Sequence, residues 1–417
     1  MVAGDRAPEF ERRLGGTLMY DAIVIGARCA GSPAGMLLAR RGHRVLVVDR
    51  ATFPSDTVST HYIQQRGLAR LAAWGLLDEL VATGVPAIKH MTVSYRDIVI
   101  AGFADAIDGI DVTYAPRRTV LDQILVNGAR AAGAEVREGF TVRELIFEDG
   151  RVVGIRGVAA DGQAHEERAR IVIGADGRNS FVAEAVGAQR YREVPAECFV
   201  YYSYFSGLRT DFHSRIGVGE QIGIWPTHDD RTLVAVMRKA EALPEFRADV
   251  EGNFHAIARA IVPEFAEELA AHGQREDRFH PMRYPDNYYR QSHGPGWALV
   301  GDAGYHKDPL TGLGISDAFE YAQLLADRVH DGLSGDVPMA DALAEYQRER
   351  DAKSHSSFEF TCSISTLELT PQLHAVFRAL GGDSAYAKDF FAMIGGGMTG
   401  EEFFAPERMA KLLGASA

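Results

Sequence analysis

Residues 20–50 read YDAIVIGARCAGSPAGMLLARRGHRVLVVDR and decide the fold of the first part of the chain. A short apolar run covers 21–25, a helical stretch runs over 34–41, and a second apolar run covers 45–48. Gly42 ends the helical stretch, because glycine tolerates the left-handed backbone found there. The order strand, turn, helix, strand predicts a βαβ unit with buried parallel strands.

The turn of this unit has the composition of a dinucleotide site. Gly26 allows the tight turn, and Gly31 allows the helix to pack closely on the strand. The helix N-terminus offers backbone N–H groups and a positive dipole to a pyrophosphate. Asp49, followed by Arg50, stands about 20 residues beyond the turn, where a ribose acid is expected. Arg28 replaces the usual second glycine and can pair with a phosphate; the alternative is a βαβ unit that binds no nucleotide.

Length and composition limit the function classes. A chain of 417 residues predicts two domains, or one large domain with insertions. The net charge of -13 argues against a nucleic-acid partner. The three cysteines, Cys29, Cys198 and Cys362, lack metal-type spacing and suit a reducing cytosol, so no metal is expected. No apolar stretch is long enough to cross a bilayer, and residues 1–19 are expected to form a disordered lead-in without a secretory signal. A cytoplasmic location follows.

The next part of the chain returns to the same sheet. An amphipathic helix is predicted within 113–132. Residues 169–180 form another buried strand, which ends at Asp176-Gly177 and leads to a helix near Ser180. An ordinary turn is the alternative interpretation of this Asp-Gly pair. An antiparallel ribbon is expected between these elements, from Val136, 140–142, 145–147 and 152–155, with a turn at 148–150.

The amino-acid composition of the chain changes after about residue 187. Residues 199–205, 221–225 and 232–237 are rich in aromatic and β-branched residues at strand length, and 244–272 is largely helical. These segments predict an inserted sheet with covering helices. The tyrosines of this block either line a pocket for an apolar molecule or pack on the sheet. Residues 346–417 are predicted to be mostly helical and either cap the substrate pocket or form an oligomer contact.

A second half of the nucleotide site is expected near residue 300. A buried strand ends at Gly301-Asp302, where the carboxylate can accept a hydrogen bond from a ribityl hydroxyl. Residues 309–314 lead into a long helix over 315–329, whose N-terminus can stabilise negative charge on a reduced flavin. The glycines of this turn suit an approach of bare backbone to a flat ring.

With both halves present, the chain resembles the FAD-dependent class A monooxygenase superfamily, the para-hydroxybenzoate hydroxylase fold, over most of 20–345. Segments 53–61 and 304–308 resemble its geranylgeranyl reductase-like branch. The tryptophan-halogenase signature, Trp-x-Trp-x-x-Ile-Pro, is absent, which disfavours halogenation. Departures from the family pattern are Arg28, Ala183, Ser316 and Asp308. The resemblance implies FAD contacts at Gly26, Arg28, Gly31, Gly35, Asp49, Arg50, Arg118, Asp176, Gly301, Asp302, Pro309, Gly312, Gly314 and Ile315.

The implied fold is α/β. A Rossmann-like FAD-binding domain with a mixed sheet is expected over 20–186 and 290–345. An antiparallel substrate domain is inserted at 187–289, and a C-terminal helical region follows at 346–417. The implied reaction reduces FAD with NADPH or NADH and lets the reduced flavin react with O2. The resulting C4a-hydroperoxide hydroxylates or epoxidises an apolar or aromatic small molecule.

Catalytic side chains are harder to predict, because the cofactor carries the chemistry. His61 is the first candidate, as base, hydrogen-bond donor or covalent attachment point; a loop histidine held by backbone is the alternative. His306 and Asp308 are second candidates, with an Asp-Pro turn as the alternative. Besides a monooxygenase, the sequence leaves open an FAD-dependent reductase or dehydrogenase of carbon–carbon bonds and a non-catalytic flavin-binding module. A dehydrogenase using NAD alone does not explain Gly301-Asp302.

Overall fold

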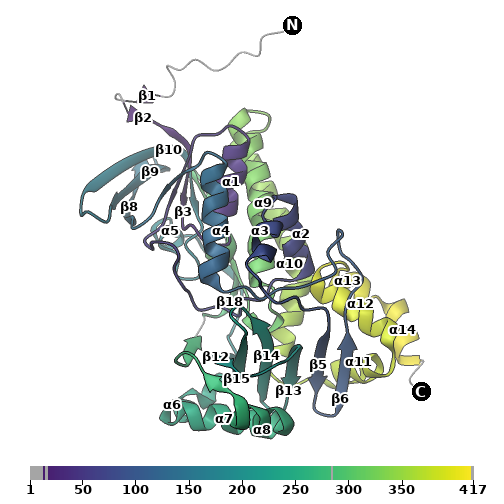
Figure 1. Ribbon diagram of the computed structural model, residues 1–417. Helices are drawn as coiled ribbons and strands as arrows, with labels where there is room; N and C mark the ends of the chain where they lie inside the picture. Colours follow the sequence, from purple (N-terminus) through teal and green to yellow (C-terminus); the bar gives the residue numbers. More distant parts are fainter. Residues whose placement is uncertain (1–12, 15–16, 283–284, 415–417) are drawn as a thin grey trace.

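A computed structural model describes residues 13–14, 17–282 and 285–414 of the chain. The predicted lead-in, 1–19, lies mostly outside these residues; within it, β1 (Arg13–Leu14) pairs antiparallel with β2 (Thr17–Leu18). Figure 1 shows two sheets that lie end to end along the molecule, with long helices beside the first and the C-terminal helices beside the second.

The first sheet contains the predicted βαβ unit. Its path is β19-β20-β10-β3-β4-β7, and the central strands β20, β10, β3, β4 and β7 run parallel. Strands β3 and β4 and the last residues of β10 are apolar and buried, which matches the composition of parallel sheets covered on both faces. Their bounds are β3 (Tyr20–Ile25), β4 (Val45–Val48), β7 (Glu135–Arg137), β10 (Ala164–Gly174), β19 (His293–Gly294) and β20 (Trp297–Leu299).

The predicted antiparallel ribbon forms with one correction. Strands β8 (Thr141–Glu148) and β9 (Arg151–Val158) pair antiparallel, with positive φ angles at Asp149 and Gly150 in their turn. The placement of Val136 in this ribbon was wrong, since Val136 pairs with Val47 of β4 in the parallel sheet. Three residues is short for a strand, and only the neighbouring β4 makes this segment a sheet member.

The second sheet is mainly antiparallel and follows the path β16-β12-β15-β14-β13-β5-β6, with β17 beside β12. It confirms the strands predicted from the aromatic and β-branched runs. Strands β5 and β6 come from 91–102, inside the range predicted for the first domain, and the division of the chain into domains stays a prediction. The bounds are β5 (Met91–Tyr95), β6 (Ile98–Gly102), β12 (Cys198–Ser206), β13 (Phe212–Ile216), β14 (Glu220–Thr227), β15 (Arg231–Lys239), β16 (Gln274–Arg275) and β17 (His280–Met282).

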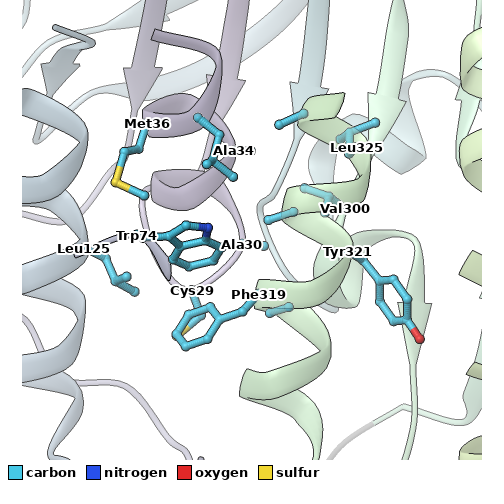
Figure 2. Close-up of a cluster of buried hydrophobic side chains, with 14 of the residues drawn as sticks. Cys29, Ala30, Ala34, Met36, Trp74, Leu125, Val300, Phe319, Tyr321 and Leu325 are labelled. Carbon is cyan, nitrogen blue, oxygen red and sulfur yellow. The ribbon is translucent and has the colours of Figure 1, made fainter. Parts of the chain in front are cut away.

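Helices from distant parts of the chain pack together beside the first sheet. Figure 2 shows Met36 and Ala34 of α1, Leu125 of α4 and Phe319 of α9 around the indole of Trp74. The rings of Trp74 and Phe319 meet edge to face at 5.4 Å between centroids. This shared core brings the start of α9 to the start of α1. The helices are α1 (Gly31–Arg40), α2 (Gln65–Ala73), α3 (Leu77–Ala82), α4 (Arg118–Ala131), α9 (Gly314–Ser334) and α10 (Met339–Ile364).

Each face of the second sheet is covered by a different set of helices. One face packs Phe199 and Tyr201 against Phe246 and Phe254, which belong to the predicted helical segment 244–272. The other face packs against the C-terminal helices, which confirms a mostly helical C-terminal region. These helices are α6 (Leu243–Ala248), α7 (Val250–Ile261), α8 (Pro263–His272), α11 (Pro371–Gly382), α12 (Ser384–Gly395), α13 (Gly400–Phe403) and α14 (Pro406–Gly414).

Short elements complete the fold. A three-stranded sheet joins β11 (Arg190–Val194), β18 (Asn287–Arg290) and β21 (Tyr305–His306), and α5 (Phe181–Ala185) follows β10. Among the described residues, no helix is both long enough and apolar enough to span a membrane.

Candidate active site

The glycine turn after β3 is closely packed against the end of β10. Gly26 has a φ of +102°, and a Cβ at this position would overlap the carbonyl oxygen of Ala175. A Cβ at Gly31 would overlap the carbonyl oxygen of Gly26 itself. Glycine is therefore required at both positions by the backbone, before any ligand is considered.

Asp49 ties the end of β4 to this turn. Its carboxylate accepts a hydrogen bond from the Ala27 N–H at 2.7 Å and another from the Ala51 N–H at 2.8 Å. Arg50 beside it is exposed. The predicted ribose acid lies at the strand end, where the sequence places it, and it also holds the turn in shape; its contact with a ribose stays a prediction.

Arg28 and Arg118 share one buried carboxylate next to the turn. Arg28 Nη1 lies 2.5 Å from Asp122 Oδ2, and Arg118 donates to both oxygens of Asp122 at 3.0 Å. Arg28 also donates to the backbone oxygen of Ser55 at 3.2 Å. Burial alone would lower the pKa of Arg118, but Asp122 raises it above its ordinary value. Two guanidinium groups against one carboxylate leave an excess positive charge beside the turn, which suits a pyrophosphate.

Asp176 of the middle motif binds the start of the short helix α5, whose N-cap is Ser180. Its carboxylate accepts from the Ser180 hydroxyl at 2.6 Å and from the Val182 N–H at 3.1 Å. Burial raises the pKa of Asp176 above its ordinary value, and these hydrogen bonds oppose the rise. The residue lies directly against Gly26, so this motif belongs to the first half of the site.

The second half of the site meets the first at the start of α1. Gly301 has a φ of +63°, and a Cβ there would lie 2.9 Å from the Cβ of Ala30. Asp302 is exposed, and a Cβ added to Gly314 would meet nothing within 4 Å. A small cavity of about 20 Å³ lies between them, lined by Gly301, Asp302, Tyr305, Lys307, Gly314, Asp317, Ala318 and Tyr321.

Both helices that start at the site lack a side-chain cap. The N-cap residues are Ala30 for α1 and Leu313 for α9, and neither side chain accepts a backbone hydrogen bond. By contrast, α11 is capped by Thr370 and α12 by Asp383. Uncapped N–H groups and the positive end of the helix dipole are what an anionic group needs.

A charged cluster behind the second half was missed by the sequence analysis. Lys307 Nζ lies 2.8 Å from Asp317 Oδ2 and donates to the Ser357 hydroxyl at 2.9 Å, and Arg66 bonds the other oxygen of Asp317. Burial lowers the pKa of Lys307, and Asp317 opposes this. An acid in the first turn of an otherwise apolar helix face was the available signal, because such an acid needs a buried partner.

His306 and Asp308 shape the loop that follows. The His306 ring stacks on Tyr288 at 5.7 Å between centroids, and burial lowers its pKa. Asp308 caps the 3₁₀ turn over Pro309–Thr311 by accepting from the Leu310 N–H at 3.0 Å. Neither residue lines the two cavities described here. Their catalytic role stays a prediction, while the turn-capping alternative is what this geometry supports for Asp308.

His61 is fully buried and has a φ of +63°. Its Nε2 hydrogen bonds the hydroxyl of Tyr204, whose ring stacks on it at 5.8 Å, and its Nδ1 has no hydrogen-bond partner among the described residues. Burial, followed by the nearby Arg118, lowers the pKa of His61 well below its ordinary value. A neutral imidazole therefore lies between Thr60 and Tyr62, which both line the larger cavity.

The larger cavity, called the apolar cavity below, has a volume of about 70 Å³ and no charged side chain among its described lining. Pro309 to Gly312 form one wall, and the turn continues to Gly314 of the smaller cavity. Ile315, next along the chain, is buried. The other walls come from the second sheet and the C-terminal helices, through Met91, Val93, Phe212, Ser214, Ile216, Gln221, Gly223, Trp225, Met237, Phe360, Ile364, Phe377, Phe390 and Ile394.

This lining bears on two alternatives that the sequence left open, while an oligomer contact of the C-terminal region stays a prediction. The C-terminal helices α10, α11 and α12 contribute Phe360, Phe377 and Phe390, so this region covers the cavity. The tyrosines of 199–205 are absent from the lining, so they pack on the sheet, as the alternative interpretation held.

The fold, the family match and the relatives place the chain among FAD-dependent flavoproteins of the class A monooxygenase-like superfamily. The chain belongs to the FAD binding domain family, whose model matches residues 19–361. This match supports FAD as the cofactor and an oxidoreductase class.

The relatives differ in their chemistry. Digeranylgeranylglycerophospholipid reductase 2 of Methanopyrus kandleri is 26% identical over 382 residues, which cover 87% of this chain and 90% of that protein. Tryptophan 2-halogenase of Chondromyces crocatus is 27% identical over 341 residues, which cover 78% of this chain and 64% of that protein. The structure of PqsL, a probable FAD-dependent monooxygenase from Pseudomonas aeruginosa, matches with a TM-score of 0.69 and 21% identity over 90% of this chain and 99% of that one. The structural likeness shows the fold alone.

Proposed function

We propose that this chain is an FAD-dependent monooxygenase that uses NADPH or NADH and O2 to hydroxylate or epoxidise an apolar or aromatic small molecule. The observation that carries the proposal is the apolar cavity, which has no charged lining and shares the turn over 309–314 with the second half of the FAD site. A cavity with a mainly apolar lining at this position suits oxygen insertion into an apolar molecule.

The residues present fit FAD. The uncapped start of α1, with Arg28 and Arg118 beside it, would hold the pyrophosphate, and Asp49 would hold the ribose of the adenosine. Asp302 would bind the ribityl chain, and the bare backbone at Gly314 leaves room for the flavin ring. When bound, FAD would supply the transfer of electrons from NAD(P)H and the activation of O2.

The protein's own residues would bind the substrate and exclude water. Met91, Trp225 and Phe390 enclose the apolar cavity. Because His61 is neutral, it would act near this cavity as a hydrogen-bonding group and not as a cation. The side chain is fully buried and lies outside the cavity lining, and its Nε2 hydrogen bonds the Tyr204 hydroxyl.

The second candidate is an FAD-dependent reductase of carbon–carbon bonds, favoured by the reductase likeness over 87% of the chain. The cavity argues against a long isoprenoid substrate. Its volume of about 70 Å³ is roughly half that of an engineered cavity of about 150 Å³ that binds benzene. A small ring molecule therefore needs less rearrangement of the walls than a long chain.

Product analysis separates these candidates. The purified, FAD-loaded protein would be given NADPH or NADH with phenol, styrene or geranylgeraniol, in air and without oxygen, and with or without bromide. We expect oxygen-dependent turnover and a product heavier by one oxygen atom. Oxygen-independent gain of two hydrogen atoms would support the reductase, and incorporation of bromine would support a halogenase. A protein that stays colourless after addition of FAD would contradict every enzyme candidate.

A further inference from the structure

One face of the second sheet forms the floor of the apolar cavity, where β5, β13 and β14 lie side by side (Figure 1). Residues that are paired across neighbouring strands point to the same face of a sheet and form rows across it. The middle row of this floor holds small residues. Ser214 of β13 pairs with Val93 of β5 on one side and with Gly223 of β14 on the other.

Larger side chains border this row of small residues on both sides. Those that line the cavity are Met91, Phe212 and Trp225 on one side, and Ile216, Gln221 and Met237 on the other. The floor is therefore a trough that crosses the strands over Val93, Ser214 and Gly223, and it is called the trough below.

The indole of Trp225 lies in the trough, over Gly223. A Cβ at Gly223 would lie 2.5 Å from Cζ3 of the indole, 3.2 Å from Cη2 and 3.5 Å from Cε3. The benzene edge of the indole thus occupies the space that a side chain at position 223 would take. The indole also stacks on Phe212, with 5.5 Å between the ring centroids and 17° between the ring planes. Glycine at position 223 is what allows the indole to lie there.

The cavity ends at this indole, but the row of small residues continues. Gly223 pairs with Ala235 of β15, and Ala235 pairs in turn with Tyr202 of β12. Ala235 is fully buried, and neither Ala235 nor Tyr202 belongs to the described lining of the cavity. The sheet therefore offers a longer trough than the cavity uses, and Trp225 is the large side chain at the boundary.

We propose that Trp225 sets the upper size limit of the molecule that the apolar cavity accepts, with Gly223 as the residue that lets the indole take this position. A ligand over Ser214 meets the indole at Gly223, so a short apolar molecule fits and a longer one does not. Trp225 is then a specificity-determining residue. The inference rests on the proposed function, because it takes the apolar cavity as the substrate site.

Binding to the FAD-loaded protein tests the size limit without turnover. The probes are toluene and butylbenzene, which share a ring and differ only in the length of the alkyl chain. Isothermal titration in the absence of NADPH and NADH gives a Kd for each. Additional buried methylene groups ordinarily tighten binding, so a Kd about tenfold higher for butylbenzene than for toluene is the expected sign of a limit. Butylbenzene binding as tightly as toluene, or no binding of either probe by the parent and all variants, would overturn the proposal.

Trp225→Ala removes the indole and should extend the cavity over Gly223 and Ala235. Butylbenzene should then bind about tenfold more tightly than it binds to the parent. The Kd of toluene should change less, because only the longer probe reaches the new space. A folded Trp225→Ala protein with the same ratio of the two Kd values as the parent would contradict the assignment.

Gly223→Ala should act in the opposite direction. Its methyl group meets the indole and displaces it toward the cavity, so toluene should bind about tenfold more weakly. In the Trp225→Ala background there is no indole to displace, so the same change should alter the Kd of toluene by less than about threefold. Equal effects in the two backgrounds would show that the methyl group acts independently of Trp225. If Trp225→Ala does not fold, Trp225→Phe replaces it, since the smaller ring does not fill the space over Gly223.

Ile224→Ala is the matched control for lost stability. Ile224 lies between Gly223 and Trp225 in β14 but faces the other side of the sheet, where it is buried in the cluster that contains Phe254. Its truncation should lower the melting temperature and leave both Kd values within about twofold of the parent. A change in the Kd ratio as large as that of Trp225→Ala would assign the effect to stability and overturn the proposal.

The size limit and the reaction can fail separately. A Kd ratio that depends on Trp225, without an oxygenated product, would leave the role of Trp225 standing and contradict only the monooxygenase. An oxygenated product from an enzyme whose Trp225→Ala variant keeps the Kd ratio of the parent would contradict only the size limit.

Discussion

The two halves of the proposed FAD site differ in how many of their polar groups are already hydrogen bonded within the protein. In the first half, the Asp49 carboxylate takes two backbone N–H groups, and Arg28 pairs with Asp122. In the second half, Asp302 is exposed, and a side chain at Gly314 would meet nothing within 4 Å.

This difference separates residues that support both the fold and FAD binding from residues that support FAD binding alone. The glycines and charges of the first half are needed for the fold even without FAD, so changes there should alter stability as well as binding. The second half faces a cavity, so changes there should alter binding alone. Measuring both quantities for each variant tests the division.

The largest expected effect is that of Asp122→Leu. Removal of the carboxylate leaves the buried Arg118 without its counter-charge, which should lower the free energy of unfolding by about 3–5 kcal/mol. Urea unfolding of the apoprotein measures this. A loss below about 1 kcal/mol would show that the first half is not held together by this ion pair.

Paired glycine variants test the comparison directly. Gly26→Ala forces a Cβ into the carbonyl oxygen of Ala175 at a φ of +102°, and should lower stability by about 2–4 kcal/mol. Gly314→Ala has free space in the first turn of α9, so stability should change by less than about 1 kcal/mol while FAD affinity falls. Equal destabilisation by both variants, in thermal or urea unfolding, would remove the distinction between the halves.

Asp302→Ala should affect the cofactor and leave the fold intact. Loss of a charged hydrogen bond to the ribityl chain is expected to raise the Kd for FAD about 10- to 100-fold. Because the side chain is exposed, the free energy of unfolding should stay within about 0.5 kcal/mol of the parent. Fluorescence titration of apoprotein with FAD measures the first quantity; an unchanged Kd would place the ribityl contact elsewhere.

The smallest expected effect is on pH dependence, at His61 between the two sheets. Its folded pKa lies well below 6.5, so the unfolded chain takes up a proton at pH values where the folded protein does not. The neutral His61 therefore contributes fully to the free energy of unfolding above pH 6.5. This contribution falls as the pH drops below 6.5, by at most about 1.4 kcal/mol per pH unit. Unfolding curves of His61→Phe between pH 7 and 5 should show a shallower slope than the parent. Identical slopes would mean that His61 gains its proton in the folded state.

Local patterns in the sequence were sufficient to predict the βαβ unit, the ribbon turn at Asp149 and the position of Gly301-Asp302 at a strand end. Each depends on neighbours within a few residues, through apolar periodicity or glycine backbone freedom. The pairing of Arg28 with Asp122 could not be predicted in this way, because the partners are 94 residues apart and are joined only by the packing of α1 on α4. The cluster of Arg66, Lys307 and Asp317 could not be predicted for the same reason, because packing of distant segments brings Arg66 to Asp317.

By itself, the sequence determined that this chain folds as an FAD-binding α/β protein and predicted a site built from two distant segments, because strand periodicity, turn glycines and strand-end acids are local properties. Only the tertiary structure decided which half has its polar groups hydrogen bonded within the protein and which half leaves them exposed. It also decided that the C-terminal helices line the apolar cavity. Hydrogen-bond satisfaction and cavity shape depend on contacts between residues far apart in the chain, and these exist only once the sheets and helices have packed.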